Sequence, residues 1–156
     1  MRTATLIVRQ QRHIHGLLQT MHESPSTREE GLLDAVDAVT AMLLLEDVVL
    51  RSGLVDPGQV ARHQDAHTRA RLALFRIATA AVHSAAFCSH LLELDHLFGE
   101  RVGDLARAVE RTIPSDRQAD IDREFDMLHL ALTTSRNPSR IANAASRCSE
   151  ALRACA

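Results

Sequence analysis

Apolar residues recur every three or four positions along most of this chain, which is the period of a helix with one buried face. In residues 3–22 the pattern runs through Leu6, Ile14, Leu18 and Met21. A second stretch repeats the pattern through to residue 51, and strand-like alternation of apolar and polar residues is almost absent. The pattern therefore predicts an all-α fold.

Proline and glycine mark where these predicted helices end. We expect breaks at residues 24–27, 53–58, 112–116 and 137–139. Ser26 or Thr27 is the expected cap of the second helix, because their hydroxyls can accept from its first backbone amides. Gly53 is expected just after that helix, and Asp56 is expected to cap the third.

The boundary between the predicted third and fourth helices is not marked by proline or glycine. Residues 59–98 contain neither Pro nor Gly, and we place the turn at residues 79–84. Gly99 and Gly103 then predict a weak point, after which the fourth helix resumes to residue 111.

These elements predict an up-down four-helix bundle with additional C-terminal helices. A chain of 156 residues is long enough for one core, so we expect a single helical domain over residues 1–156. Residues 1–111 would form the bundle, and residues 112–156 would add helices at about 117–134 and 139–155.

Composition narrows the classes of function. The chain has 46% apolar residues but only 3% aromatic ones, which predicts a core of Leu, Ala, Val and Ile. The net charge of −2 gives no excess of basic residues, so we expect no nucleic-acid partner. No apolar run approaches the roughly 18 residues of a membrane span, so we expect no membrane partner. Three cysteines without metal-type spacing favour a reducing, cytoplasmic setting.

Histidines and carboxylates at ligand-like spacing are the candidate chemistry. His63 and His67 are four residues apart and would leave one face of a helix. His90 and Asp95 are five apart, so their directions differ by about 140° and converge only on a ligand beside the helix. The set of candidate ligands, one group per predicted helix, is His13, His15, Glu46, His63, His67, His90 and Asp95. Such a mixed set suits iron or manganese.

These motifs resemble those of hemerythrin, the non-haem di-iron four-helix bundle. His63-x-x-x-His67 is similar to the family's third-helix motif, and His90-x-x-x-x-Asp95 to its fourth. The turn around Glu46 resembles the second-helix motif, and the resemblance covers roughly residues 3–103. It implies two irons bridged by Glu46 and Asp95, with an open position for dioxygen or a related small ligand.

The chain departs from the family pattern at several positions. Met42 stands four residues before Glu46, where the family has His, and a thioether is a poor ligand for iron. His13 and His15 lie about 200° apart around their helix, so only one can face inward. The spacing from His67 to the next motif is also short. The site would therefore hold two metals, one or none, and we expect binding, storage or sensing rather than enzyme catalysis.

Two other interpretations use different residues. Glu93-x-x-His96 with Asp126-x-x-His129 resembles the ligand pattern of ferritin-like di-iron proteins, although exposed histidine tips would give the same pattern. A metal-free helical module is the third interpretation, with homodimerisation through Ala-rich residues 78–86 or 142–154. Cys88 lies among apolar residues, and we expect a buried structural thiol there.

Overall fold

The computed structural model describes residues 1–135 and 137–155, and its regular structure there is entirely helical. The helices are α1 (Thr3–Glu23), α2 (Arg28–Leu50), α3 (Pro57–Thr79), α4 (Ala85–Thr112), α5 (Gln118–Thr134) and α6 (Pro138–Arg153), with a short 3₁₀ turn at Pro25–Thr27. The all-α prediction is confirmed.

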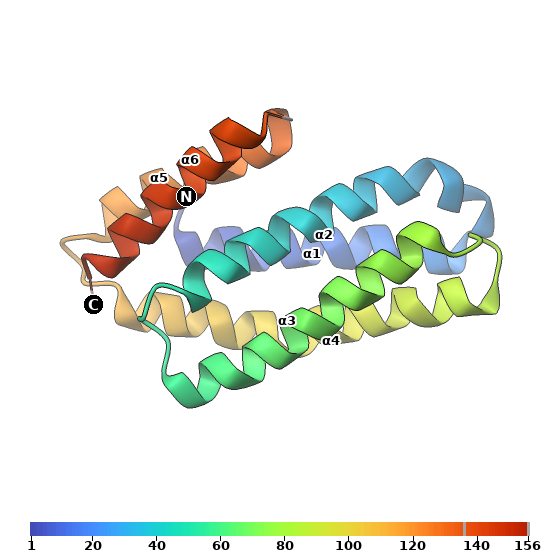
Figure 1. The fold of residues 1–156 in the computed structure, drawn as a ribbon, viewed down its shortest axis with the longest axis horizontal. Coiled ribbons are helices and arrows are strands. Elements are labelled where there is room, and N and C mark those ends of the chain that lie inside the picture. The colour runs from blue at the N-terminus through green and yellow to red at the C-terminus, as the bar shows by residue number, and fades with distance from the viewer. Residues whose placement is uncertain (136, 156) are drawn as a thin grey trace.

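The first four helices form the predicted up-down bundle, and the last two are appended to one end of it (Figure 1). Helix α5 contacts α1, and α6 contacts α2. The backbone amide of Thr3 donates to Asp122 Oδ1 at 2.8 Å, so a hydrogen bond also joins the start of α1 to α5. None of the described helices has the length and hydropathy of a membrane span.

The turns of the bundle follow the sequence signals closely. Gly53 has φ +82°, a value that only glycine adopts easily, and it lies in the turn that follows α2. Asp56 accepts a hydrogen bond from Gly58 N at 3.1 Å and caps α3. Ser84 Oγ accepts from Phe87 N at 3.1 Å, so α4 begins after the predicted turn at residues 79–84.

Two details of the sequence prediction are wrong. Helix α4 continues without interruption through Gly99 and Gly103, because the apolar face on either side of them is buried. An interior glycine costs only about 1 kcal/mol relative to alanine, which that burial offsets. Neither Ser26 nor Thr27 caps α2; Thr27 Oγ1 donates instead to Ser24 O at 2.7 Å, inside the 3₁₀ turn.

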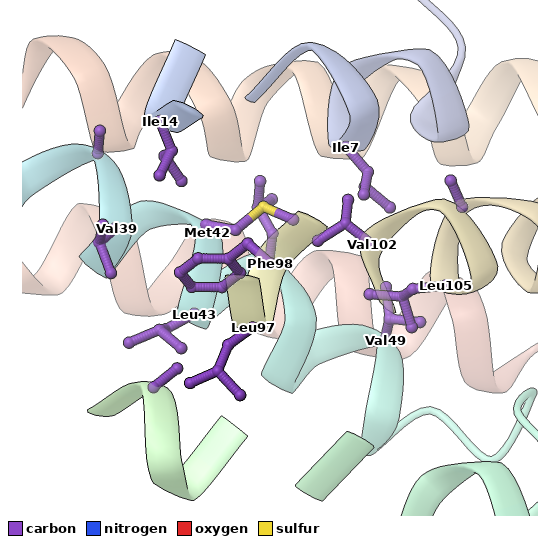
Figure 2. Close-up of a cluster of buried hydrophobic side chains, with 14 of the residues drawn as sticks. Ile7, Ile14, Val39, Met42, Leu43, Val49, Leu97, Phe98, Val102 and Leu105 are labelled. Atoms are coloured by element: carbon purple, nitrogen blue, oxygen red, sulfur yellow. The ribbon is translucent and has the colours of Figure 1, made fainter. Parts of the chain in front are cut away.

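The bundle core is aliphatic, with a few phenylalanines at its centre. Figure 2 shows the Met42 thioether among Ile14, Phe98 and Val102, which come from α1 and α4. Met42 is fully buried. The position at which the hemerythrin pattern would place a histidine therefore packs as an ordinary core residue.

A buried arginine closes one end of the bundle. Arg28 Nε donates to Met21 O at 2.7 Å and its Nη1 donates to Val82 O at 3.0 Å. Its Nη2 donates to His22 O at 3.3 Å. One guanidinium thus joins the last turn of α1, the first turn of α2 and the turn between α3 and α4.

Candidate functional site

A fully buried carboxylate, that of Glu46, lies at the centre of the bundle. His67 of α3 meets it, with Nδ1 at 2.8 Å from Glu46 Oε1. Arg101 of α4 forms an ion pair with the same oxygen, with Nη1 at 2.5 Å. Burying an unpaired carboxylate costs a great deal of free energy, so these two partners are what make Glu46 tolerable in the core.

The guanidinium of Arg101 is held from two sides. Its Nε donates to Leu97 O one turn earlier at 3.0 Å, and its Cζ lies 5.3 Å from the ring centroid of Phe98. Only 9% of the Arg101 side chain is exposed. A fixed positive charge therefore stands beside the buried carboxylate, on the helix opposite it.

His63 lies one turn before His67 and is also buried. Burial is the main cause that lowers its pKa below 6.5, and the negative charge of Glu46 opposes the shift. His63 Nδ1 and Glu46 Oε2 have no hydrogen-bond partner among the described residues. The imidazole is therefore neutral at pH 7, next to a carboxylate that already has its cation.

The remaining candidate ligands lie in separate places. His15 Nδ1 is 2.7 Å from Asp95 Oδ1, but that His15 side chain is 54% exposed. His90 approaches Glu93, with Nδ1 3.9 Å from Oε2. His13 is exposed on α1. The structure thus brings Glu46 to His67 and His15 to Asp95, and leaves these pairs apart from His90.

This arrangement does not fit a metal pair. Within residues 1–135 and 137–155, no three His, Cys, Asp or Glu side chains are grouped so that they could hold a metal ion. The two irons that the hemerythrin resemblance implies would need Glu46 and Asp95 as shared ligands, and each has another partner. Iron binding by these residues stays a prediction.

The ferritin-like motif is also dispersed. His96 is exposed and faces Glu100, with Nε2 3.3 Å from Oε1. His129 contacts Gln10 on α1, with Nε2 3.4 Å from Oε1. His96 is thus an exposed tip, and His129 is partly buried against α1.

The cysteines differ from one another in burial. Cys88 is of intermediate exposure, so the prediction that it is buried is wrong. Cys148 of α6 is fully buried, and burial raises the pKa of its thiol to about 12.

A long apolar groove runs between α2 and α3, outside the buried cluster. Its volume is about 830 Å³, and His67 contributes to its floor. Phe75 and Leu72 on its α3 side are 64% and 48% exposed. Leu33, one turn before the groove residue Val36 on α2, extends the same apolar stripe. Large apolar side chains gathered on one face indicate a surface that contacts another molecule.

The two helices that border this groove carry opposite charge. The acidic residues at the surface of α2 are Glu29, Glu30, Asp34, Asp37 and Asp47, and the one basic residue within α2, Arg28, is buried. The basic residues at the surface of α3 are Arg62, Arg69, Arg71 and Arg76, against a single carboxylate, Asp65. Of these side chains, Asp47 and Arg71 line the groove, together with Arg51, which pairs with Asp47. Arg62 and Arg69 line a separate pocket between α3 and α4.

No protein-family model, curated protein or solved structure matches this chain. The likeness to hemerythrin therefore rests on the spacing of a few residues. What this chain does has to be argued from its own site and surface.

The residue that the sequence analysis missed is Arg101. The signal was present, because Leu94, Phe98 and Leu105 place position 101 on the buried face of the helix. A charged residue at such a position needs a buried partner, and Glu46 is the only carboxylate that is fully buried among the described residues.

Proposed function

We propose that this chain is a metal-free helical interaction module, and that the groove between α2 and α3 binds a helix of a protein partner. The observation that carries the proposal is the exposed apolar groove flanked by one acidic and one basic helix. An amphipathic helix laid in such a groove buries its apolar stripe and places its charges over the two rims.

The buried cluster supports the metal-free half of the proposal. A metal ion between helices supplies positive charge to inward carboxylates, and here Arg101 supplies that charge to Glu46. His67 completes the contact from α3, so the three helices are joined without any added ion. The bundle can thus act as a rigid support for the groove above it.

The charges define the chemistry of the partner. A helix that fits must offer an apolar stripe to the groove, with a basic side chain beside Asp47 and an acidic side chain beside Arg71. Opposite potentials across an interface speed association and exclude partners with the wrong charge. A partner that is purely basic or purely acidic would meet repulsion on one rim.

A stapled helical peptide can test the groove directly. The probe is a fluorescein-labelled, helix-stapled amphipathic peptide with a Leu/Phe stripe, lysines along one side of the stripe and glutamates along the other. Fluorescence anisotropy with the full chain at nanomolar to micromolar concentration should show saturable binding. A stapled peptide of the same composition in scrambled order is the matched probe.

Two chain variants decide where the peptide binds. Phe75→Glu places a charge in the groove and should abolish binding, whereas Leu130→Glu on α5, at an apolar side chain of similar exposure, should leave it unchanged. Absence of saturable binding, or equal binding by both variants, would show that the groove is not a helix site.

A further inference from the structure

We infer that a pocket between α5 and α6 binds a small amphiphile, namely an apolar chain that carries a carboxylate at each end. The pocket shares no lining residue with the α2–α3 groove, so this inference does not rest on the proposed function. Its volume is about 320 Å³, which lies at the lower end of the range for small-ligand pockets.

The α5 side of this pocket is apolar. Ala131 of α5 and Ala144 of α6 are half-buried between the two helices, and Met127 and Leu130 line the same pocket. The exposed fractions of Met127 and Leu130 are 49% and 53%, so much of their apolar surface faces solvent. An alkyl chain bound here would cover that surface, and the burial of apolar area favours its binding.

The α6 side of the pocket carries two exposed arginines, Arg140 and Arg147. Seven residues make almost two full helical turns, so the two side chains leave α6 on the same side, about 10.5 Å apart along its axis. Neither side chain has an ion-pair or hydrogen-bond partner within residues 1–135 and 137–155. Two cations therefore line the pocket without counter-ions.

The pocket also lacks acidic residues that could serve as counter-ions. Among the described residues, no Asp or Glu lines it. The carboxylates of α5 and α6 all lie outside it, namely those of Asp120, Asp122, Glu124, Asp126 and Glu150. Asp126 already pairs with the N-terminal amine at 3.0 Å, and Asp122 accepts from the amide of Thr3. The positive charge of the pocket is thus left for a ligand to neutralise.

The two arginines stand at opposite ends of the pocket. The end of α5 is joined closely to the start of α6, so Thr134 and Arg140 lie at the connected end. The two helices run in opposite directions, because the connection between them is short. Seven residues back along α5 is Met127, and seven residues on along α6 is Arg147, so these two lie at the far end. An apolar chain with a carboxylate at each end can therefore meet both arginines while it covers Leu130.

Decanedioate is the probe, and a nuclear magnetic resonance titration of the full, isotope-labelled chain measures both its affinity and its position. Saturable shifts should gather at the residues that line the pocket, with ligand added to about 2 mM because a ligand this small binds weakly. Decanoate, which has one carboxylate, should bind about fivefold more weakly, since one exposed ion pair contributes no more than that. Decanediol, which has no charge, should bind more weakly still. Equal affinities of decanediol and decanedioate, or no saturable shift at these residues, would overturn the inference.

Removal of each arginine's charge tests the contact at both ends of the ligand. Arg140→Gln and Arg147→Gln should each lower the affinity for decanedioate about fivefold. Each should leave the affinity for decanoate nearly unchanged, because decanoate can pair with the remaining arginine. Arg153→Gln, on the same helix but outside the pocket, is the matched control and should bind like the unchanged chain. An arginine variant that binds decanedioate with undiminished affinity would overturn the two-ended ligand.

Two variants show that this pocket and the α2–α3 groove are separate sites. Leu130→Glu places a carboxylate beside the two arginines and should abolish the binding of decanedioate, whereas Phe75→Glu should leave it unchanged. The stapled peptide should respond to the same two variants in the opposite way. Resonances of α1–α4 that stay in place confirm that the Leu130→Glu chain is folded. Decanedioate binding that survives Leu130→Glu would overturn the α5–α6 site, whether or not the peptide binds the groove.

Discussion

Arg101 of α4 and Glu46 of α2 form an ion pair at the centre of the bundle, with 2.5 Å between Nη1 and Oε1. The pair joins two helices that are not neighbours in the sequence, with Glu46 in the last two turns of α2. His67 of α3 contacts the same oxygen, so one carboxylate oxygen links side chains from three helices. The consequences for stability and for metal binding can each be measured.

Removal of the guanidinium should destabilise the fold strongly. Arg101→Met leaves Glu46 buried without its cation, which costs about 3–5 kcal/mol in comparable buried pairs. Urea denaturation followed by circular dichroism measures the loss. The matched control is Arg107→Ala, which removes a surface ion pair with Asp104 and should cost less than about 1 kcal/mol.

A second variant separates the charge from the packing. In Glu46→Gln/Arg101→Met both charges are absent, so most of the lost stability should return. If the double variant is as unstable as Arg101→Met, the side-chain packing of Arg101 over Phe98 matters more than its charge.

Stability should not depend on a bound metal. Purified protein from iron-supplemented cells should contain well under one equivalent of iron per chain, by mass spectrometry of the metal. Addition of EDTA should leave the melting temperature unchanged, because Arg101 already neutralises Glu46. About two irons per chain, bound through His63 and His67, would instead support the hemerythrin-like hypothesis.

Acid should destabilise the fold through His63, which is buried, and His129, which is partly buried. Burial lowers the pKa of His63 and of His129 below 6.5 in the folded chain. The unfolded chain therefore binds protons more readily, and stability rises with pH in this range. The contribution is fully present above pH 6.5 and declines as the pH falls from there toward the folded pKa values.

Denaturation at pH 7.5 and at pH 5.5 measures this effect. His63→Gln keeps a polar side chain of similar size but cannot gain a proton, so the difference between the two pH values should shrink. His22→Gln, a half-exposed histidine at the end of α1, is the control and should retain the full difference.

The three thiols should react at different rates. Burial and a pKa of about 12 leave Cys148 with almost no thiolate at neutral pH, so it should resist a disulfide reagent in the folded protein. Cys88 and Cys155 are half-exposed and should react first. Mass spectrometry after a short treatment identifies which residues are modified, and early modification of Cys148 would contradict its burial.

The helices were predictable from sequence because their signals are local. The apolar period, the Asp56 cap and the Gly53 turn are each decided by residues within one or two turns of the chain. The weak point predicted at Gly99 and Gly103 was wrong for the same reason. The local free-energy cost of these glycines is outweighed by the burial of α4 against other helices.

The site was only partly predictable, because it depends on contacts between helices. The spacing correctly indicated that Glu46 and His67 approach each other. The position of Asp95 could not be inferred, since a five-residue interval does not say which side of α4 faces the core; the buried side is that of Leu91, Leu94 and Phe98. Asp95 therefore meets His15 near the surface instead.

Arg28 fastens one end of the bundle, and the first turn of α3 at the other end holds no buried residue. Arg28 ties the turn between α3 and α4 to the neighbouring helices, whereas the first buried residue of α3 at the other end is His63, well inside the helix. Thermal opening should therefore begin at the start of α3 and travel toward Ile77. Amide hydrogens of residues 60–63 would exchange with solvent long before those of residues 73–77, because α3 would open from its N-terminal end first.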